Sequence, residues 1–181
     1  MTLGSFARVA GLIFCLAGYA MAADEWQPIP RKLPGPGIKL ADADRQTIET
    51  ALHHLEARLP TLPTTADGVD LPADIDVFAK AVRYALINDE FYKPQDVKKA
   101  TDLLAAAEKR ADELSHGQHS WAQQHGVLAR GYHSRIDGSA QPYGLEIPAY
   151  VDFSKPVPLY VWLHGRGDNA TDMHFLAERQ R

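Results

Sequence analysis

The sequence is poor in cysteine, in net charge and in long apolar runs. Cys15 is its single cysteine, so no disulfide can form within the chain. The 181 residues carry 19 basic and 23 acidic side chains, and this balance lacks the electrostatic footprint of a nucleic-acid-binding protein. Hydrophobic residues make up 45% and charged residues 23%, which argues against a disordered chain, a collagen-like chain and a multi-span membrane protein. We therefore expect a globular protein with no nucleic-acid partner.

Charge is also sparse at the N-terminus, where Arg8 is the only charged residue before Asp24. An apolar stretch follows Arg8 and ends at Ala20-Met21-Ala22, a small-x-small pattern typical of signal peptidase sites. The stretch is shorter than the roughly 20 apolar residues of a transmembrane helix. Residues 1–22 are therefore predicted to be a signal peptide of a secreted or periplasmic protein, with no integral membrane span after cleavage. An uncleaved N-terminal anchor is the alternative.

Helical periodicity begins after a lead-in at 23–41 that is rich in proline and glycine. Apolar residues at spacings of three and four predict three helices. The first is capped by Asp42 or Asp44 and ends before Pro60, the second runs from about Pro72 to Asn88, and the third from about Pro94 to Ser115. Gly117 is placed for a left-handed turn after the third helix. Together they predict a helical region over 42–117, in which no pattern indicates catalysis.

The histidines of the first half do not form a pattern typical of a metal site. His53 and His54 are adjacent, so on a helix their side chains point about 100° apart. His116, His119 and His125 have no accompanying cluster of carboxylates or thiolates. We expect solvated or capping histidines, and neither a metal nor a cofactor.

The period of the pattern changes after residue 126. Val127 to Ser134 mixes apolar and polar residues as strands do, and Leu145-Glu146-Ile147 alternates again before Pro148. Asp137-Gly138 lies between them and is a strong turn signal. The segment is predicted to be an antiparallel hairpin.

Five consecutive apolar residues, Leu159-Tyr160-Val161-Trp162-Leu163, follow the expected hairpin. They do not alternate with polar residues, so they predict a central strand buried on both faces. His164-Gly165-Arg166-Gly167-Asp168 comes next, and Asn169, Thr171 and Asp172 offer caps for a further helix with Met173, Leu176 and Ala177 on its apolar face. The predicted order is strand, glycine loop and helix.

A glycine loop in this position suits acyl transfer. The oxyanion of that reaction needs backbone N–H donors about 3 Å away, and glycine lets the backbone turn sharply and approach a substrate closely. Gly-x-Gly alone is a weak signal, and a tight turn without catalytic role is the alternative. The loop contains neither G-x-G-x-x-G nor Gly-Lys-Ser/Thr, which argues against a dinucleotide site and a P-loop.

Residues 130–181 resemble the start of a secreted α/β-hydrolase of the prolyl oligopeptidase/esterase type. The resemblance rests on four stretches: Arg130-Gly131-Tyr132, Ile136-Asp137-Gly138-Ser139, Gln141-Pro142-Tyr143-Gly144-Leu145 and Leu159 to Asp168. It implies an α/β fold in which the helical region precedes the first strands of a truncated hydrolase sheet, over 126–181. It also implies backbone donors at Gly165, Arg166 and Gly167, with Arg166 the first choice, and His164 as a brace of the loop.

The nucleophile elbow of such an enzyme, Gly-x-Ser-x-Gly, is missing from the sequence, so the Ser/Asp/His triad is not in this chain. One hypothesis is an N-terminal fragment of an exported serine hydrolase, inactive alone, whose full-length form acts on an ester or peptide substrate. The other is a complete small exported helical binding module without catalysis. Whether the chain belongs to an enzyme is therefore left open by the sequence.

Overall fold

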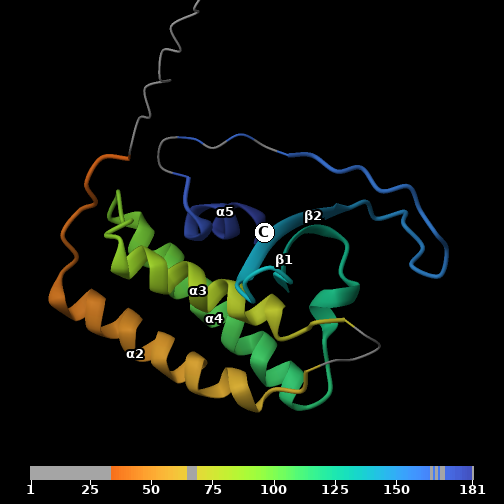
Figure 1. Ribbon diagram of the computed structural model, residues 1–181, viewed down its shortest axis with the longest axis horizontal. Coiled ribbons are helices and arrows are strands. Elements are labelled where there is room, and N and C mark those ends of the chain that lie inside the picture. Colours follow the sequence, from red (N-terminus) through yellow and green to blue (C-terminus); the bar gives the residue numbers. More distant parts are fainter. Residues whose placement is uncertain (1–33, 65–68, 164, 166, 168–169, 181) are drawn as a thin grey trace, which may run out of the picture. The chain divides into compact units, whose positions relative to one another are not determined.

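Four α-helices and one two-stranded antiparallel sheet make up the described part of the protein (Figure 1). The structure is a computed structural model that describes residues 34–64, 69–163, 165, 167 and 170–180. The expectation of a mixed α/β fold is confirmed at this coarse level. The predicted signal peptide at 1–22 and the first part of the lead-in lie outside the described residues.

The three helices expected in the first half are confirmed. They are α2 (Asp42–Arg58), α3 (Ala73–Ile87) and α4 (Gln95–Ser115), with a short 3-10 turn, η2 (Leu59–Thr61), after α2. Their apolar stripes face one another and form the core, because each stripe must be removed from water. Side chains buried in this core include Ile48, Leu52, Leu55, Ile75, Phe78, Val82, Leu104, Ala107 and Leu114.

The helix ends follow the sequence with one exception. The N-cap of α2 is Ala41, which makes no side-chain hydrogen bond, so the expected cap by Asp42 or Asp44 is wrong. Both aspartates lie in the first turn instead, where a negative charge interacts favourably with the helix dipole. Gly117 has a φ of +72°, which confirms the left-handed turn after α4.

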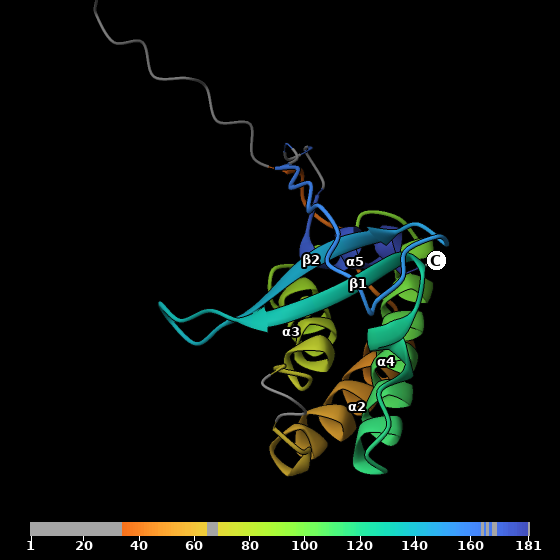
Figure 2. The same ribbon diagram turned by 90° about the vertical axis from the view of Figure 1, so that its right-hand side faces the viewer.

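The predicted hairpin is also confirmed. Strand β1 (Gly126–His133) pairs with β2 (Ala140–Ile147), and the register places Ala129 opposite Gly144. A 3-10 turn, η3 (Ser120–Gln123), connects α4 to β1. Both strands contact α3, and α2 lies on the side of α3 and α4 away from the hairpin (Figure 2).

The prediction of a buried central strand at 159–163 is wrong. These residues form no strand, and their exposure ranges from 68% at Val161 to 91% at Leu163. They belong to the long connection that leaves β2 and returns to α5 (Asp172–Arg179) in Figure 1. An apolar run predicts burial but does not say what buries it. In the described residues β1 and β2 pair only with each other, and no strand pairs with residues 159–163.

Candidate functional site

The glycine loop joins the exposed apolar run to helix α5. Gly165 and Gly167 are exposed, and a Cβ atom added at either position would meet nothing within 4 Å. Packing within the described chain therefore does not require glycine at these positions, and the space beside the backbone is open. His164 and Arg166, the other two residues expected in the site, lie outside the described residues, as does Asp168.

The loop ends at Thr171, which caps helix α5. The Thr171 hydroxyl accepts a hydrogen bond of 3.4 Å from the backbone N–H of His174, which satisfies one of the free donors of the first helical turn. Of the three caps offered by the sequence, the structure uses Thr171. Met173 and Leu176 are fully buried on the inner face of α5, as their spacing predicted. The helix that follows the loop is thus fixed at its first turn.

His174 connects this first turn to Asp96 at the start of helix α4. Its Nδ1 lies 2.9 Å from the Thr171 hydroxyl and its Nε2 lies 3.2 Å from Oδ1 of Asp96. Asp96 is fully buried and also accepts hydrogen bonds from the Lys99 ammonium and from the backbone N–H groups of Tyr92 and Lys93. Burial raises the pKa of the Asp96 carboxyl, but these hydrogen bonds outweigh it and hold the pKa below its usual range.

Thr171, His174 and Asp96 have the order of a hydroxyl–histidine–carboxylate relay, yet the arrangement is a structural one. In a serine-protease triad Nε2 faces the hydroxyl and Nδ1 the carboxylate, whereas the two nitrogens are exchanged here. Thr171 is only 7% exposed, and its oxygen is engaged in the helix cap. A nucleophile must be reachable by substrate, so we assign Thr171 to capping.

Lys80 of α3 makes a second connection to the first turn of α5. Its Nζ lies 3.0 Å from Oδ2 of Asp172 and donates a hydrogen bond of 2.8 Å to the carbonyl of Ala140, at the start of β2. The Lys80 side chain is 12% exposed and that of Asp172 is 37% exposed, so the ammonium end of this ion pair is shielded from water and the carboxylate end is partly open to it. One ammonium group therefore joins α3, β2 and α5.

A buried charge cluster ties the helices to the hairpin. The carboxylate of Asp74, fully buried in α3, accepts hydrogen bonds from Nε of Arg130 at 2.6 Å and from the backbone N–H of Gly131 at 2.7 Å. The indole N–H of Trp121 donates to the same carboxylate at 3.0 Å. Buried charges are stable only when paired and hydrogen-bonded, and Asp74 meets both conditions.

Arg110 of α4 completes this cluster. It donates to the carbonyl of Asp74 at 2.9 Å and to the side-chain oxygen of Gln180 at 3.1 Å, and its guanidinium carbon lies 4.8 Å from the centre of the Phe78 ring. Burial lowers the pKa of Arg110 to about 10, so the side chain stays charged at neutral pH.

Sequence reasoning missed Lys80, Asp96 and the Asp74 cluster. Arg110 carried a usable signal, because it lies three residues after Ala107 and four before Leu114, on the apolar stripe of its helix. A charged side chain on such a stripe indicates a buried partner. Asp74 and Arg130 are 56 residues apart in the chain, and no local pattern marks such a pair.

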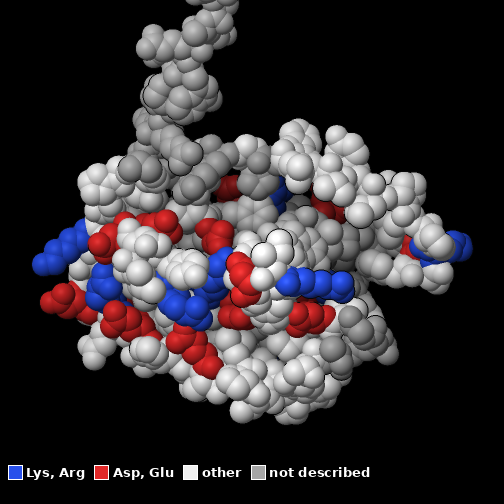
Figure 3. All heavy atoms as spheres, in the orientation of Figure 1, with Lys and Arg blue, Asp and Glu red and all other residues white. Residues whose placement is uncertain are grey.

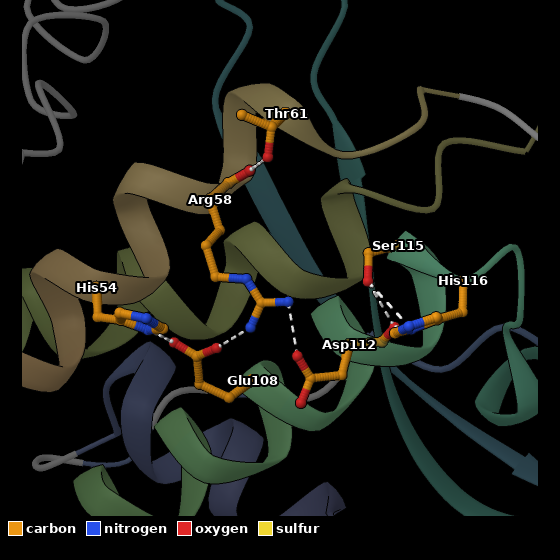
Figure 4. Close-up of polar contacts among 7 residues, drawn as sticks. All are labelled: His54, Arg58, Thr61, Glu108, Asp112, Ser115 and His116. Atoms are coloured by element: carbon orange, nitrogen blue, oxygen red, sulfur yellow. Dashed lines mark hydrogen bonds and ion pairs between the residues drawn. The ribbon is translucent and has the colours of Figure 1, made fainter.

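A groove between α2 and α4 carries a second polar network (Figure 4). Oε1 of Glu108 in α4 lies 2.7 Å from Nδ1 of His54 in α2, and the same carboxylate pairs with Arg58. The guanidinium of Arg58 also lies 2.7 Å from Oδ1 of Asp112. Burial lowers the pKa of Arg58, but hydrogen bonds to Asp112 and Glu108 outweigh it and raise the pKa. The network joins two helices at a partly exposed surface, where such pairs contribute little stability individually.

The adjacent histidines of α2 point to different partners, as their positions on a helix predicted. His53 lies 3.6 Å from Glu56 whereas His54 binds Glu108, so the adjacent rings contact different carboxylates. His116 binds the carbonyl of Asp112 at the end of α4, and His125 binds that of Val151. Among the described residues no group of three or more His, Cys, Asp or Glu side chains is arranged to hold a metal ion.

On the face drawn in Figure 3, basic and acidic side chains are interspersed.

Comparisons with family models, with curated proteins and with solved structures found no match to this chain. None of the helices within the described ranges has the length and apolar character needed to cross a membrane.

Proposed function

We propose that this chain is the N-terminal part of an exported serine hydrolase, a peptidase or an esterase. In this proposal the backbone around Gly165 to Gly167 supplies one oxyanion-hole donor, and the nucleophilic serine, its acid and its histidine come from sequence beyond Arg181. The proposal is supported by the order of elements: a hairpin, an apolar run, a glycine loop and a helix. The 181-residue chain alone is then without hydrolytic activity.

The exposed apolar run is the observation that carries the proposal. Five consecutive side chains from Leu159 to Leu163 are between 68% and 91% exposed. Burying one large apolar side chain contributes about 1.5–3 kcal/mol, so leaving five in water forgoes a large stabilisation. A contiguous apolar surface of this kind usually marks an interaction site. The run forms no strand in the 181-residue chain, whereas in the longer protein of this proposal a neighbouring strand and covering helices would pair with it and bury it.

The surroundings of the loop suit the proposed chemistry. Oxyanion donors must lie at fixed positions, and the loop ends on a helix whose first turn is capped by Thr171 and whose inner face is buried. The open space beside Gly165 and Gly167 leaves room for a substrate carbonyl or for a second segment of backbone. The predicted signal peptide at 1–22 adds export to the proposal.

Reading the coding sequence beyond Arg181 tests the proposal at its first requirement. We expect the reading frame to continue and to encode Gly-x-Ser-x-Gly, followed by an acidic residue and a histidine. A stop codon directly after Arg181, confirmed on the transcript, would contradict it.

A small exported helical binding module is the second candidate, and the helical core formed by α2, α3 and α4 favours it. Thermal unfolding of the chain, together with a measurement of its association state, distinguishes the two. A cooperative transition of a monomer supports the binding module. Association through the exposed run supports the hydrolase fragment, because that run then lacks the layers that cover it.

A further inference from the structure

Helix α5 is attached to the preceding helices by polar contacts at both of its ends. Asp172 pairs with Lys80 of α3, His174 approaches Asp96 of α4, and Gln180 accepts from Arg110 of α4. The first two contacts lie in the first turn, directly after the glycine loop. Asp96 is fully buried and the Lys80 side chain is 12% exposed, so each contact has one partner that is held away from water, unlike a surface ion pair.

The apolar contacts of α5 do not fix its position equally well. Met173 and Leu176 are fully buried against the core, which favours docking of the helix. Hydrophobic contact is non-directional, so it tolerates small shifts and rotations of a helix with only eight residues. The Lys80 ammonium, between Asp172 and the carbonyl of Ala140, has a defined geometry, and so has the imidazole of His174 between Thr171 and Asp96.

We propose that Lys80 and Asp96 are positioning residues for the glycine loop at Gly167. They hold the first turn of α5, and the backbone N–H of Ala170, directly before Thr171, donates a hydrogen bond of 3.2 Å to the carbonyl of Gly167. Through this contact they set where the backbone of Gly167 lies. The helical region at 42–117 is then a scaffold of the catalytic site. This inference rests on the proposed function for its catalytic meaning, whereas the attachment of α5 can be tested without it.

Hydrogen exchange on the 181-residue chain tests the attachment. Lys80→Met keeps the length of the side chain and removes its charge, and Asp96→Asn keeps the shape of the carboxylate. The matched controls are Lys98→Met and Asp102→Asn, which remove an exposed ion pair on α4. We expect exchange of the α5 amides to become about tenfold faster or more in the two test variants, with α2 unaffected and the controls unchanged. Unchanged exchange in α5 would overturn the inference, whatever the activity of the protein.

The extended gene product is the protein encoded when the reading frame continues beyond Arg181. Its kinetics test whether Lys80 and Asp96 affect catalysis. A misplaced oxyanion donor lowers kcat without weakening ground-state binding, so we expect Lys80→Met and Asp96→Asn to lower kcat on a nitrophenyl ester about 100-fold, with KM nearly constant. The two controls keep wild-type kcat. Faster α5 exchange together with normal kcat would overturn the positioning role. An extended product that is well folded and inactive in wild-type form would overturn the proposed function instead, and with it the catalytic part of this inference.

Discussion

Nε of Arg130 in strand β1 donates a hydrogen bond of 2.6 Å to the carboxylate of Asp74 in helix α3. Asp74 is fully buried and Arg130 is 8% exposed. This pair joins the hairpin to the helices, and Arg110 and Trp121 extend it to α4 and to the turn that precedes β1. The hairpin and the helical region therefore share one buried polar core.

Removing the charge of Asp74 is expected to destabilise the protein strongly. Asp74→Asn leaves the buried guanidinium of Arg130 without its carboxylate, and breaking a buried pair costs about 3–5 kcal/mol. Urea denaturation measures the loss of free energy of unfolding. Asp102→Asn, which affects an exposed pair with Lys98, should change it by about 0.5 kcal/mol or less. A loss below about 1 kcal/mol for Asp74→Asn would contradict the assigned role of the cluster.

Strand β1 approaches α3 too closely at Gly131 for any side chain. A Cβ atom there would lie 2.3 Å from the carbonyl oxygen of Ala73 and 2.6 Å from Cγ1 of Val77. Gly131→Ala should therefore cost about 1–3 kcal/mol through backbone displacement, and weaken the hydrogen bond from Gly131 to Asp74. Thermal unfolding measures the effect. At Gly35 a Cβ atom meets nothing within 4 Å, so Gly35→Ala is the matched control and should leave the midpoint nearly unchanged.

His133 gives the protein a pH-dependent contact. Its two ring nitrogens lie 2.6 Å from Asp70 and 3.1 Å from Asp76. Burial lowers the pKa of His133, but hydrogen bonds to Asp76 and Asp70 outweigh it and raise the pKa above the ordinary 6.5. A raised folded-state pKa stabilises the protein fully below the unfolded value, and this contribution is lost as pH rises through the folded-state pKa.

We therefore expect Tm to fall as pH rises above about 6.5. His133→Gln removes this part of the pH dependence, and His53→Gln, at an exposed position, keeps it. Tm measured from pH 5 to pH 9 checks both variants. An identical pH slope in wild type and His133→Gln would show that the histidine does not contribute.

Trp162 reports whether the apolar run has a covering partner. It is 75% exposed whereas Trp121 is 4% exposed, so in a variant that keeps Trp162 alone a neutral quencher should reach the indole freely. In the extended gene product the same indole should be protected, because the proposed sheet buries it. Equal quenching in both proteins would contradict burial of the run by sequence beyond Arg181.

Local patterns predicted the local structure of this protein. A helix was predicted from Ile48, Leu52 and Leu55 because each lies one turn from the next. A hairpin was predicted from Asp137-Gly138 because its tight turn needs backbone conformations that few residue types adopt. Leu159 to Leu163 led to a wrong prediction because apolar character indicates burial without identifying the partner. Asp74 with Arg130, and Lys80 with Asp172, were missed because tertiary folding brings them together from distant parts of the chain.

Covalent labelling with a fluorophosphonate probe tests the central claim most directly, because the probe reacts only with an activated serine held beside a working oxyanion hole. The extended gene product and the 181-residue chain are incubated with the probe and the modified residue is mapped by mass spectrometry. The proposal predicts a single label on a serine within Gly-x-Ser-x-Gly beyond Arg181, and no label on the shorter chain. An unlabelled extended product would contradict it, as would a label on the 181-residue chain.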